Sequence, residues 1–171
     1  MFRVSSSGYA GNVVDSADDE LADPRLTAVG LFLEAYGGLT AQLGAVHAAH
    51  GLAGTDFDVL IRLARSPDYR LRMSDLAAQT DLSTSGITRI VDRLEHRGLI
   101  RRDSEPGDRR GCAAVLTHQG HQALAADLPP LLDAIQRCLI DPLTPTQLQG
   151  VTDGLRILRD ALRPAAATRT P

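Results

Sequence analysis

The chain has 171 residues, a formal net charge of −3 and 43% apolar residues, with 4% aromatic residues and no Trp. This length accommodates one domain with a substantial core, and the apolar content excludes a wholly disordered chain. Because aromatic residues are so few, the core must be built from Leu, Val, Ile and Ala, a composition that favours helices.

The charge is distributed unevenly along the chain, and every basic residue is Arg. The stretch from Arg62 to Arg110 holds eleven Arg and eight acidic residues, a local balance of +3, whereas the remainder has a balance of −6. A basic centre between acidic flanks indicates one surface that faces a polyanion. Arg in place of Lys is also typical of a GC-rich genome, so Arg usage alone proves little.

Several classes of protein are excluded by what the sequence lacks. Cys112 and Cys138 are too few for a disulfide scaffold, and their spacing fits no zinc site. No apolar run has the length of a membrane span, and no signal peptide precedes the domain, so we expect a cytoplasmic protein without a membrane partner. No Gly-rich phosphate loop or nucleophile elbow is present, so we expect neither an enzyme nor a cofactor.

Helical periodicity starts after residues 1–23, which we expect to form a flexible arm. A long amphipathic helix is predicted from Pro24 to His50, with a weak point at Gly37-Gly38. Thr55 is expected to cap a second helix that ends near Ser66-Pro67. The first helix is indicated by residues that recur at three- and four-residue steps, Val29, Leu33, Tyr36, Leu43 and His47. The predicted buried face of the second consists of Phe57, Leu60, Ile61 and Ala64.

Two short helices and a hairpin come next. Ser74 is expected to cap the first short helix and Ser83 the second, which ends at Gly98, where a left-handed residue fits. Residues 99–103 and 112–116 predict two strands, joined by a loop in which Pro106-Gly107 suits a type II turn. The second short helix buries Ile87, Ile90, Val91 and Leu94, at the i, i+3, i+4, i+7 spacing.

Two further helices precede residues 164–171, which we expect to be a disordered tail. Thr117 opens the first of these helices, in which Pro129-Pro130 should cause a kink or break. Thr144 caps the second, with Pro145 in its first turn and Gln147 completing a capping box. Its apolar stripe predicts packing against a partner helix and consists of Leu148, Val151, Leu155, Leu158 and Leu162.

Two short helices followed by a hairpin form the order of a winged helix-turn-helix, a DNA-binding arrangement. On the outward face of the second helix, Ser85 and Thr88 lie near the N-terminus, where hydroxyls approach phosphates closely. Arg89, one turn on, is placed for base edges, with guanine favoured, and Arg93 for a backbone phosphate. A merely solvated helix face would carry similar residues, so the helix alone leaves both interpretations open.

The hairpin favours DNA binding. Arg109 and Arg110 lie beside Pro106-Gly107 at an exposed tip, and an Arg on a thin ribbon can enter the narrow, electronegative minor groove. Asp108, two residues before Arg110, is placed to hold that side chain extended. A polar turn is common in any hairpin, but a chance combination of this helix with this wing is much less common.

These stretches resemble the MarR family of bacterial transcriptional regulators. The resemblance extends from about Phe57 to Leu124, and its most specific parts are Asp108-Arg109-Arg110 and the Leu-Thr-x-x-Gly segment that ends at Gly120. It implies a mainly α fold with a two-stranded wing (α+β), a homodimer on a pseudo-palindromic DNA duplex, and a repressor released by small, often aromatic or phenolic, ligands. Residues 24–54 and 117–163 would form the dimerisation region and residues 55–116 the DNA-binding domain. With Arg110 in the minor groove, the implied DNA-binding set is Ser74, Ser83, Thr84, Ser85, Thr88, Arg89, Arg93, Arg109 and Arg110.

Three alternatives remain open. The histidine pairs His47/His50 and His118/His121 fit a metal site, although surface or interface histidines are the commoner explanation. A redox sensor would need a reactive Cys, whereas Cys112 is expected in the core and Cys138 in packing or an interface. A winged unit that binds protein rather than DNA is the third. A pocket for an effector would draw on Tyr36, His47, Phe57 and Arg62, each of which also fits a core or surface role.

Overall fold

The computed structural model describes residues 20–80, 82–105 and 108–162, without the side chains of residues 105 and 108–111. The chain divides into two compact units, Met1–Ala41 and Gln42–Pro171. Most of the predicted arm, the whole of the predicted tail and the predicted turn at Pro106-Gly107 lie outside the described residues. In chain order the elements are α2 (Pro24–Ala49), α3 (Gly54–Ala64), the short 3-10 helix η1 (Pro67–Tyr69), β1 (Arg70–Arg72), α4 (Met73–Thr80), α5 (Thr84–His96), β2 (Ile100–Glu105), β3 (Asp108–Leu116), α6 (His118–Ile135), the π-helix η2 (Gln136–Ile140) and α7 (Pro145–Leu162).

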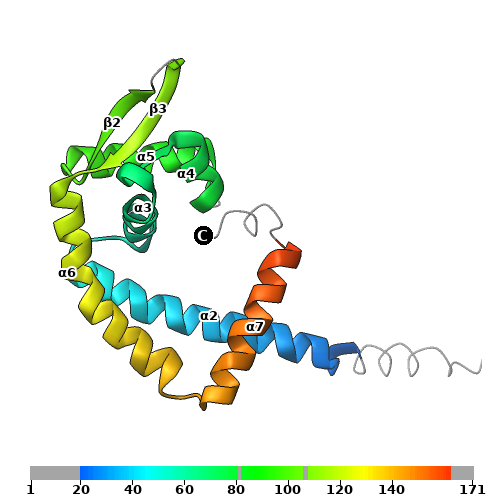
Figure 1. Cartoon of the computed structure of the whole chain (residues 1–171). Coiled ribbons are helices and arrows are strands. Elements are labelled where there is room, and N and C mark those ends of the chain that lie inside the picture. Colours follow the sequence, from blue (N-terminus) through cyan, green and yellow to red (C-terminus); the bar gives the residue numbers. More distant parts are fainter. Residues whose placement is uncertain (1–19, 81, 106–107, 163–171) are drawn as a thin grey trace, which may run out of the picture. The chain divides into compact units, whose positions relative to one another are not determined.

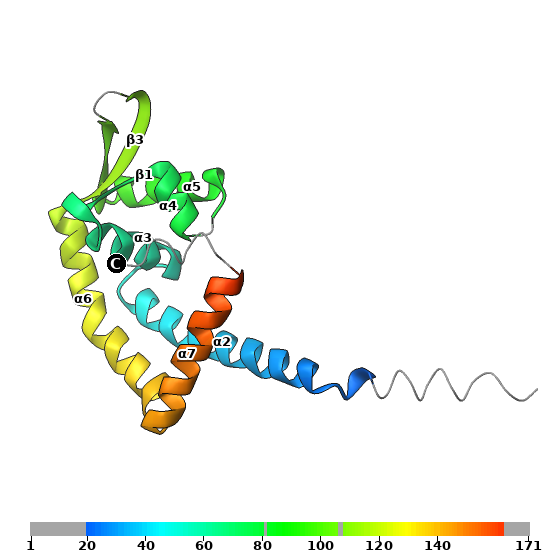
Figure 2. The ribbon, with the colours of Figure 1, turned by 45° about the vertical axis from the view of Figure 1, so that its right-hand side comes forward.

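The strands form one antiparallel sheet in the order β1-β3-β2. The β2–β3 ribbon extends away from α4 and α5 (Figure 1), and β1 lies along the base of β3 (Figure 2). The sheet differs from the prediction in two ways, because β1 is an additional strand and the hairpin strands are longer. Asp108, Arg109 and Arg110 consequently belong to β3, with Asp108 paired to Glu105, and not to a loop.

The core lies where α3, α4, α5 and α6 pack together and against the sheet, as the apolar spacing requires. The predicted inward face of α5 is confirmed, since all four of its apolar residues are buried. The predicted face of α3 is shifted, because Phe57 and Ile61 are only partly buried while Val59 and Leu63 are fully buried. The largest fully buried apolar residues are Val59, Leu60, Leu63, Leu76, Ile87, Val91, Leu94 and Ile100.

Helix caps mostly follow the sequence signals. The Ser83 hydroxyl accepts from the Gly86 N–H at 3.1 Å, and Thr144 and Gln147 form the predicted capping box. Thr55 and Ser74, the predicted caps of α3 and α4, instead lie inside these helices, which begin at Gly54 and Met73. At the start of α3 the Asp56 carboxylate accepts from the N–H of Ala53, so an acidic side chain replaces the predicted hydroxyl.

Helix α6 runs from His118 to Ile135 through Pro129-Pro130, so the predicted break is wrong. The two prolines remove two backbone donors, a cost that tertiary packing must offset. Residues on both sides of the pair are buried, Asp127 before it and Leu131 and Ala134 after it. This packing accounts for the uninterrupted helix.

The apolar residues of α2 and α7 are largely exposed. The predicted helix is confirmed, and Val29, Leu33 and Tyr36 of its periodic stripe are each about half exposed or more in this single chain. The α7 stripe is exposed in the same way from Val151 onward. Exposed faces of this kind are typical of surfaces that another chain covers. Among the described residues, no helix is both long and apolar enough to cross a membrane.

Candidate nucleic-acid interface

The outward face of α5 carries one unengaged Arg. The side chain of Arg89 is exposed and makes no hydrogen bond or ion pair with any other described residue. It lies opposite the buried stripe of Ile87, Ile90, Val91 and Leu94, so it projects from a helix whose other face is fixed in the core. An Arg held at its base and free at its tip is suited to donating to a polar partner outside the protein.

The hydroxyl residues at the start of α5 have partners within the helix. Ser83 caps the helix, and its Oγ also lies 3.1 Å from the Oγ of Ser85. The Thr88 hydroxyl donates to the carbonyl of Thr84 at 2.7 Å. Ser83, Thr84 and Ser85 are exposed together at the helix N-terminus, where unpaired backbone N–H groups favour an anion.

Arg93 is held by an acidic residue from another helix. The Asp56 carboxylate, only 2% exposed, accepts from Nε of Arg93 at 3.1 Å and also from its Nη2. Arg97 adds a third, weaker contact, with Nη1 3.4 Å from the second oxygen of Asp56. The start of α3 is thereby joined to the C-terminal half of α5, so Arg93 is less free than the predicted phosphate contact required.

The β2–β3 ribbon corresponds to the predicted wing, and Arg102 of β2 joins its base to α5. Its guanidinium donates to Asp92 and to Glu95, at 2.6 Å each, and its backbone N–H donates to the other oxygen of Glu95 at 3.0 Å. Burial alone would lower the pKa of Arg102, but the hydrogen bonds and charges of Asp92 and Glu95 outweigh it and raise the pKa above its usual range. Arg102 is therefore charged at every relevant pH.

The connection between the wing and α6 explains the Leu-Thr-x-x-Gly segment. The Thr117 hydroxyl accepts from the Gly120 N–H at 3.0 Å and donates to the carbonyl of Gly98 at 2.7 Å. A Cβ on Gly120 would overlap the carbonyl oxygen of Leu99 and lie 2.7 Å from Leu116 Cδ1. Thr117 and Gly120 thus let α6 start in direct contact with the end of α5 and the sheet.

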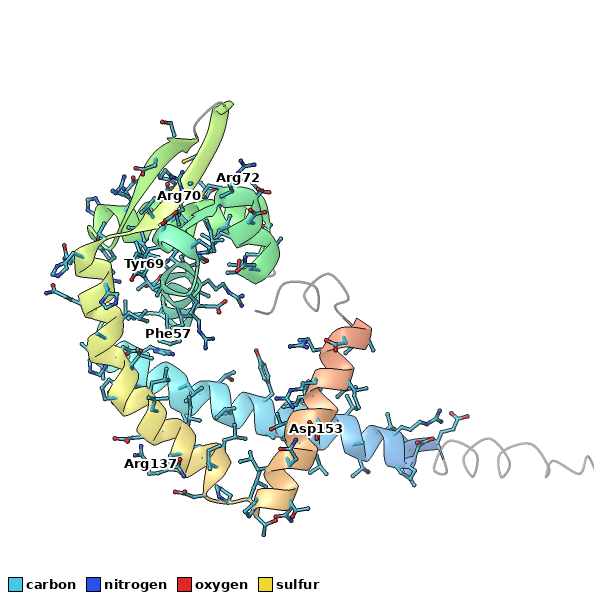
Figure 3. All side chains as sticks on the ribbon, viewed as in Figure 1. Phe57, Tyr69, Arg70, Arg72, Arg137 and Asp153 are labelled. Atoms are coloured by element: carbon cyan, nitrogen blue, oxygen red, sulfur yellow. The ribbon has the colours of Figure 1, made fainter. Side chains whose placement is uncertain are left out.

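A buried polar cluster joins the end of α2 to α6. Nδ1 of His47 lies 2.6 Å from Oδ2 of the fully buried Asp127, and the His47 ring stacks on Phe57 with centroids 4.5 Å apart. His50 approaches the other Asp127 oxygen at 3.3 Å, and that oxygen has no hydrogen-bond partner among the described residues. Figure 3 shows Phe57 on α3 on the side that faces this cluster.

The remaining predicted site residues are dispersed. The Nη2 of Arg62 pairs with Asp58 at 3.2 Å, and its buried Nε has no partner among the described residues. Tyr36 belongs to the other unit, on an exposed part of α2. His121 lies edge-on to Tyr69, which is labelled in Figure 3 beside α6. In the described parts of the chain, no three His, Cys, Asp or Glu residues are arranged to hold a metal ion.

The expectation that Cys112 lies in the core is wrong. Cys112 is only half buried, whereas Ala113 and Ala114 are both fully buried because β3 is the central strand and is covered on both faces. Cys138 is exposed in η2. Within this chain, neither residue is part of the core.

Sequence reasoning missed three polar residues that organise the site: Asp56, Asp127 and Arg102. The two acids were detectable, because each lies on the apolar stripe of its helix. Asp56 precedes Val59 and Leu60 by three and four residues, and Asp127 follows Leu124 by three residues and precedes Leu131 by four. A charged residue at a core position usually has a buried partner. No comparable signal marked Arg102.

Known proteins resemble both the winged unit and the wider chain. A model of the MarR family matches residues 50–111. AbsC, a MarR family transcriptional regulator from Streptomyces coelicolor, is 34% identical, with a TM-score of 0.79 over 84% of this chain and 97% of AbsC. Sco3205 from the same organism, another MarR family transcriptional regulator, was solved in complex with DNA; it is 32% identical, with a TM-score of 0.78 over 83% and 89% of the two chains. The transcriptional repressor MprA of Escherichia coli is 38% identical over 82 residues, 48% of this chain, and the match spans about half (47%) of MprA.

Proposed function

Because this chain belongs to the MarR family of transcriptional regulators, we propose that it binds an inverted-repeat DNA site as a homodimer and thereby represses transcription. The family consists of DNA-binding regulators rather than enzymes. In this proposal α5 enters the major groove and the β2–β3 ribbon contacts the adjacent minor groove. Each chain of the dimer occupies one half-site.

The main support for this proposal is the set of exposed polar side chains on the outward face of α5. Arg89 projects from it without a partner in the described chain, and the exposed hydroxyls of Ser83, Thr84 and Ser85 precede it by one turn. This arrangement supplies a phosphate-binding helix start followed by a donor for base edges. The strand position of Arg109 and Arg110 adds a second basic element, suited to the minor groove.

The homodimer is supported by the apolar faces of α2 and α7, each considered by itself. Phe32 and Tyr36 on α2, and Leu155 and Leu158 on α7, are about half exposed or more. A single water-soluble chain rarely leaves so many large apolar residues uncovered, and a second copy is the partner that an inverted repeat requires. Leu158→Glu is expected to produce monomers in analytical ultracentrifugation, whereas Arg156→Glu, on a charged position of the same helix, is expected to leave the dimer intact.

We further propose that a small aromatic ligand releases the protein from DNA. This proposal is supported by two separate features, the His47–Phe57 stack, which offers an aromatic surface, and the Nε of Arg62 on α3, a buried donor without a partner among the described residues. We expect 4-hydroxybenzoate to lower DNA affinity in the parent protein and to have a smaller effect on Arg62→Gln. Release by a chelator or an oxidant instead would favour the metal or redox alternative.

The repressor activity is tested by selection from random DNA followed by transcription in vitro. Selected duplexes are expected to share an inverted repeat whose half-site centres lie about 10 base pairs apart or a multiple of that. Protein added to a template with this repeat over the promoter should stop transcription. Selection without enrichment of any sequence would contradict the proposal and favour a winged unit that binds protein.

A further inference from the structure

We propose that Arg102 is a positioning residue that fixes the wing relative to the recognition helix α5, and that this fixed angle contributes to DNA specificity. The inference depends on the proposed function, since it assumes that α5 and the wing contact one duplex. It goes beyond that function because Arg102 need not touch DNA. Its role is to set the spacing between two groove contacts.

Arg102 donates three hydrogen bonds to side chains of α5. Its guanidinium donates to Asp92 and Glu95, which are three residues apart on α5, and its backbone N–H donates to Glu95. Glu95 therefore holds both the main chain and the side chain of one residue in β2. A planar guanidinium between two carboxylates restricts both the distance and the rotation of the strand on the helix.

Arg102 lies at the point where the wing leaves the core. Leu99 and Ile100, just before it, are buried, while Ser104, two residues further along, is exposed. No hydrogen bond or ion pair of the described side chains joins α5 to the wing beyond Arg102. A strand rises about 3.3 Å per residue, so the ribbon extends about 10 Å further between Arg102 and Glu105. A small rotation of β2 relative to α5 at Arg102 would therefore produce a larger displacement of the backbone at Arg109 and Arg110.

A different role for Arg102 would be to neutralise charge, because Asp92 and Glu95 lie on a helix that approaches phosphates. The two roles make opposite predictions for Asp92→Asn. If charge alone matters, removing the Asp92 charge should tighten binding to every duplex. If position matters, Asp92→Asn should lower the ratio of affinities for selected and random duplexes.

The experiment compares Arg102→Gln, Arg102→Lys and Asp92→Asn with a matched control, Arg101→Gln. Arg101 is the adjacent residue of β2, its side chain is 57% exposed, and among the described side chains it pairs only with Asp103 of its own strand. Affinities for the selected duplex and for a random duplex are measured by fluorescence anisotropy. We expect all three test variants to lose at least about fivefold in the ratio of the two affinities, the lower end of the effect of one lost base contact. The control should keep its ratio.

A DNA-free measurement separates this inference from the proposed function. Spin labels at His96→Cys and Ser104→Cys, in a background with Cys112→Ala and Cys138→Ser, report the distance between α5 and the wing. Dilution with unlabelled chain suppresses distances between subunits. We expect one narrow distribution for the parent and for Arg101→Gln, and a broadened or shifted one for Arg102→Gln and Arg102→Lys.

Each result has a defined meaning. An unchanged distribution in Arg102→Gln overturns the positioning role, whatever the parent protein does with DNA. A broadened distribution with an unchanged affinity ratio overturns the link to specificity. Rescue of both readouts by Arg102→Lys would overturn the requirement for a planar guanidinium between the two carboxylates, because a single positive charge would then suffice to hold the wing. If the parent protein has no sequence preference, the proposed function fails while the distance measurement still decides whether Arg102 positions the wing.

Discussion

The carboxylate of Asp56, in the first turn of α3, accepts a hydrogen bond at 3.1 Å from Nε of Arg93 on α5. The same carboxylate accepts from the N–H of Ala53 and so also caps α3. A single buried acid thus joins the start of α3 to α5. Its removal should affect folding first and DNA binding second.

Asp56→Ala is expected to lower the free energy of unfolding by about 2 kcal/mol, from the lost cap and the lost charge-assisted hydrogen bonds to a partly exposed Arg93. Urea unfolding followed by circular dichroism measures this change. Asp58→Ala is the control, because Asp58 is half exposed and its one ion pair within the described parts of the chain is with Arg62, one turn along the same helix. Equal losses in the two variants would show that Asp56 has no special structural role.

Arg89→Ala is expected to relax sequence preference, since Arg89 is the unengaged basic residue on the outward face of α5. Affinity for the selected duplex should fall by about five- to hundredfold, with little change on random duplex. Arg93→Ala is the comparison, because Arg93 is bound to Asp56 and should lose stability in addition to affinity. An equal loss for Arg89→Ala on all duplexes would reassign Arg89 to a phosphate contact.

Arg110→Ala is expected to weaken binding to the selected duplex at least about fivefold without changing the thermal unfolding midpoint, because the proposed groove contact is lost on a ribbon that extends away from α4 and α5 (Figure 1). Arg109→Ala, which removes the same charge from the adjacent residue of β3, is the comparison. Anisotropy and differential scanning calorimetry on the same preparations separate affinity from folding. Unchanged affinity in Arg110→Ala would remove the wing from the interface.

Gly120→Ala is expected to destabilise the protein by about 3 kcal/mol or more, because the added methyl group would overlap the carbonyl oxygen of Leu99. Gly150→Ala on α7 is the matched control, since nothing lies within 4 Å of a Cβ at that position. In a helix interior this control should gain up to about 1 kcal/mol. A stable Gly120→Ala protein would mean that α6 can move away from the end of α5 at little cost.

Local signals predicted the elements that depend on nearest neighbours along the chain. The Ser83 cap, the Thr117 cap and the capping box of Thr144 and Gln147 each involve residues three apart, and all are confirmed. The buried face of α5 follows from spacing alone. Strand β1 has only three residues and forms by pairing with β3, which lies more than forty residues further along the chain. A local sequence pattern contains no information about such a distant pairing.

The candidate site could be predicted in its residue types but not in its connections. Arg93 was expected to bind phosphate, and the sequence did not reveal that Asp56, thirty-seven residues earlier, would hold it. The same holds for His47, expected in the core or a pocket, whose partner Asp127 lies eighty residues away. Pairings of this kind depend on tertiary packing, which also carries α6 through Pro129-Pro130.

The most direct test of sequence-specific DNA binding is fluorescence anisotropy of the full chain on a labelled duplex selected from random DNA, titrated with salt and competed with unrelated duplex. Sequence-specific binding predicts a tight complex of one dimer per duplex, resistance to the unrelated competitor, and an affinity that falls steeply with salt as Arg–phosphate contacts are lost. Weak binding that is equal on every duplex and abolished by the competitor would contradict it.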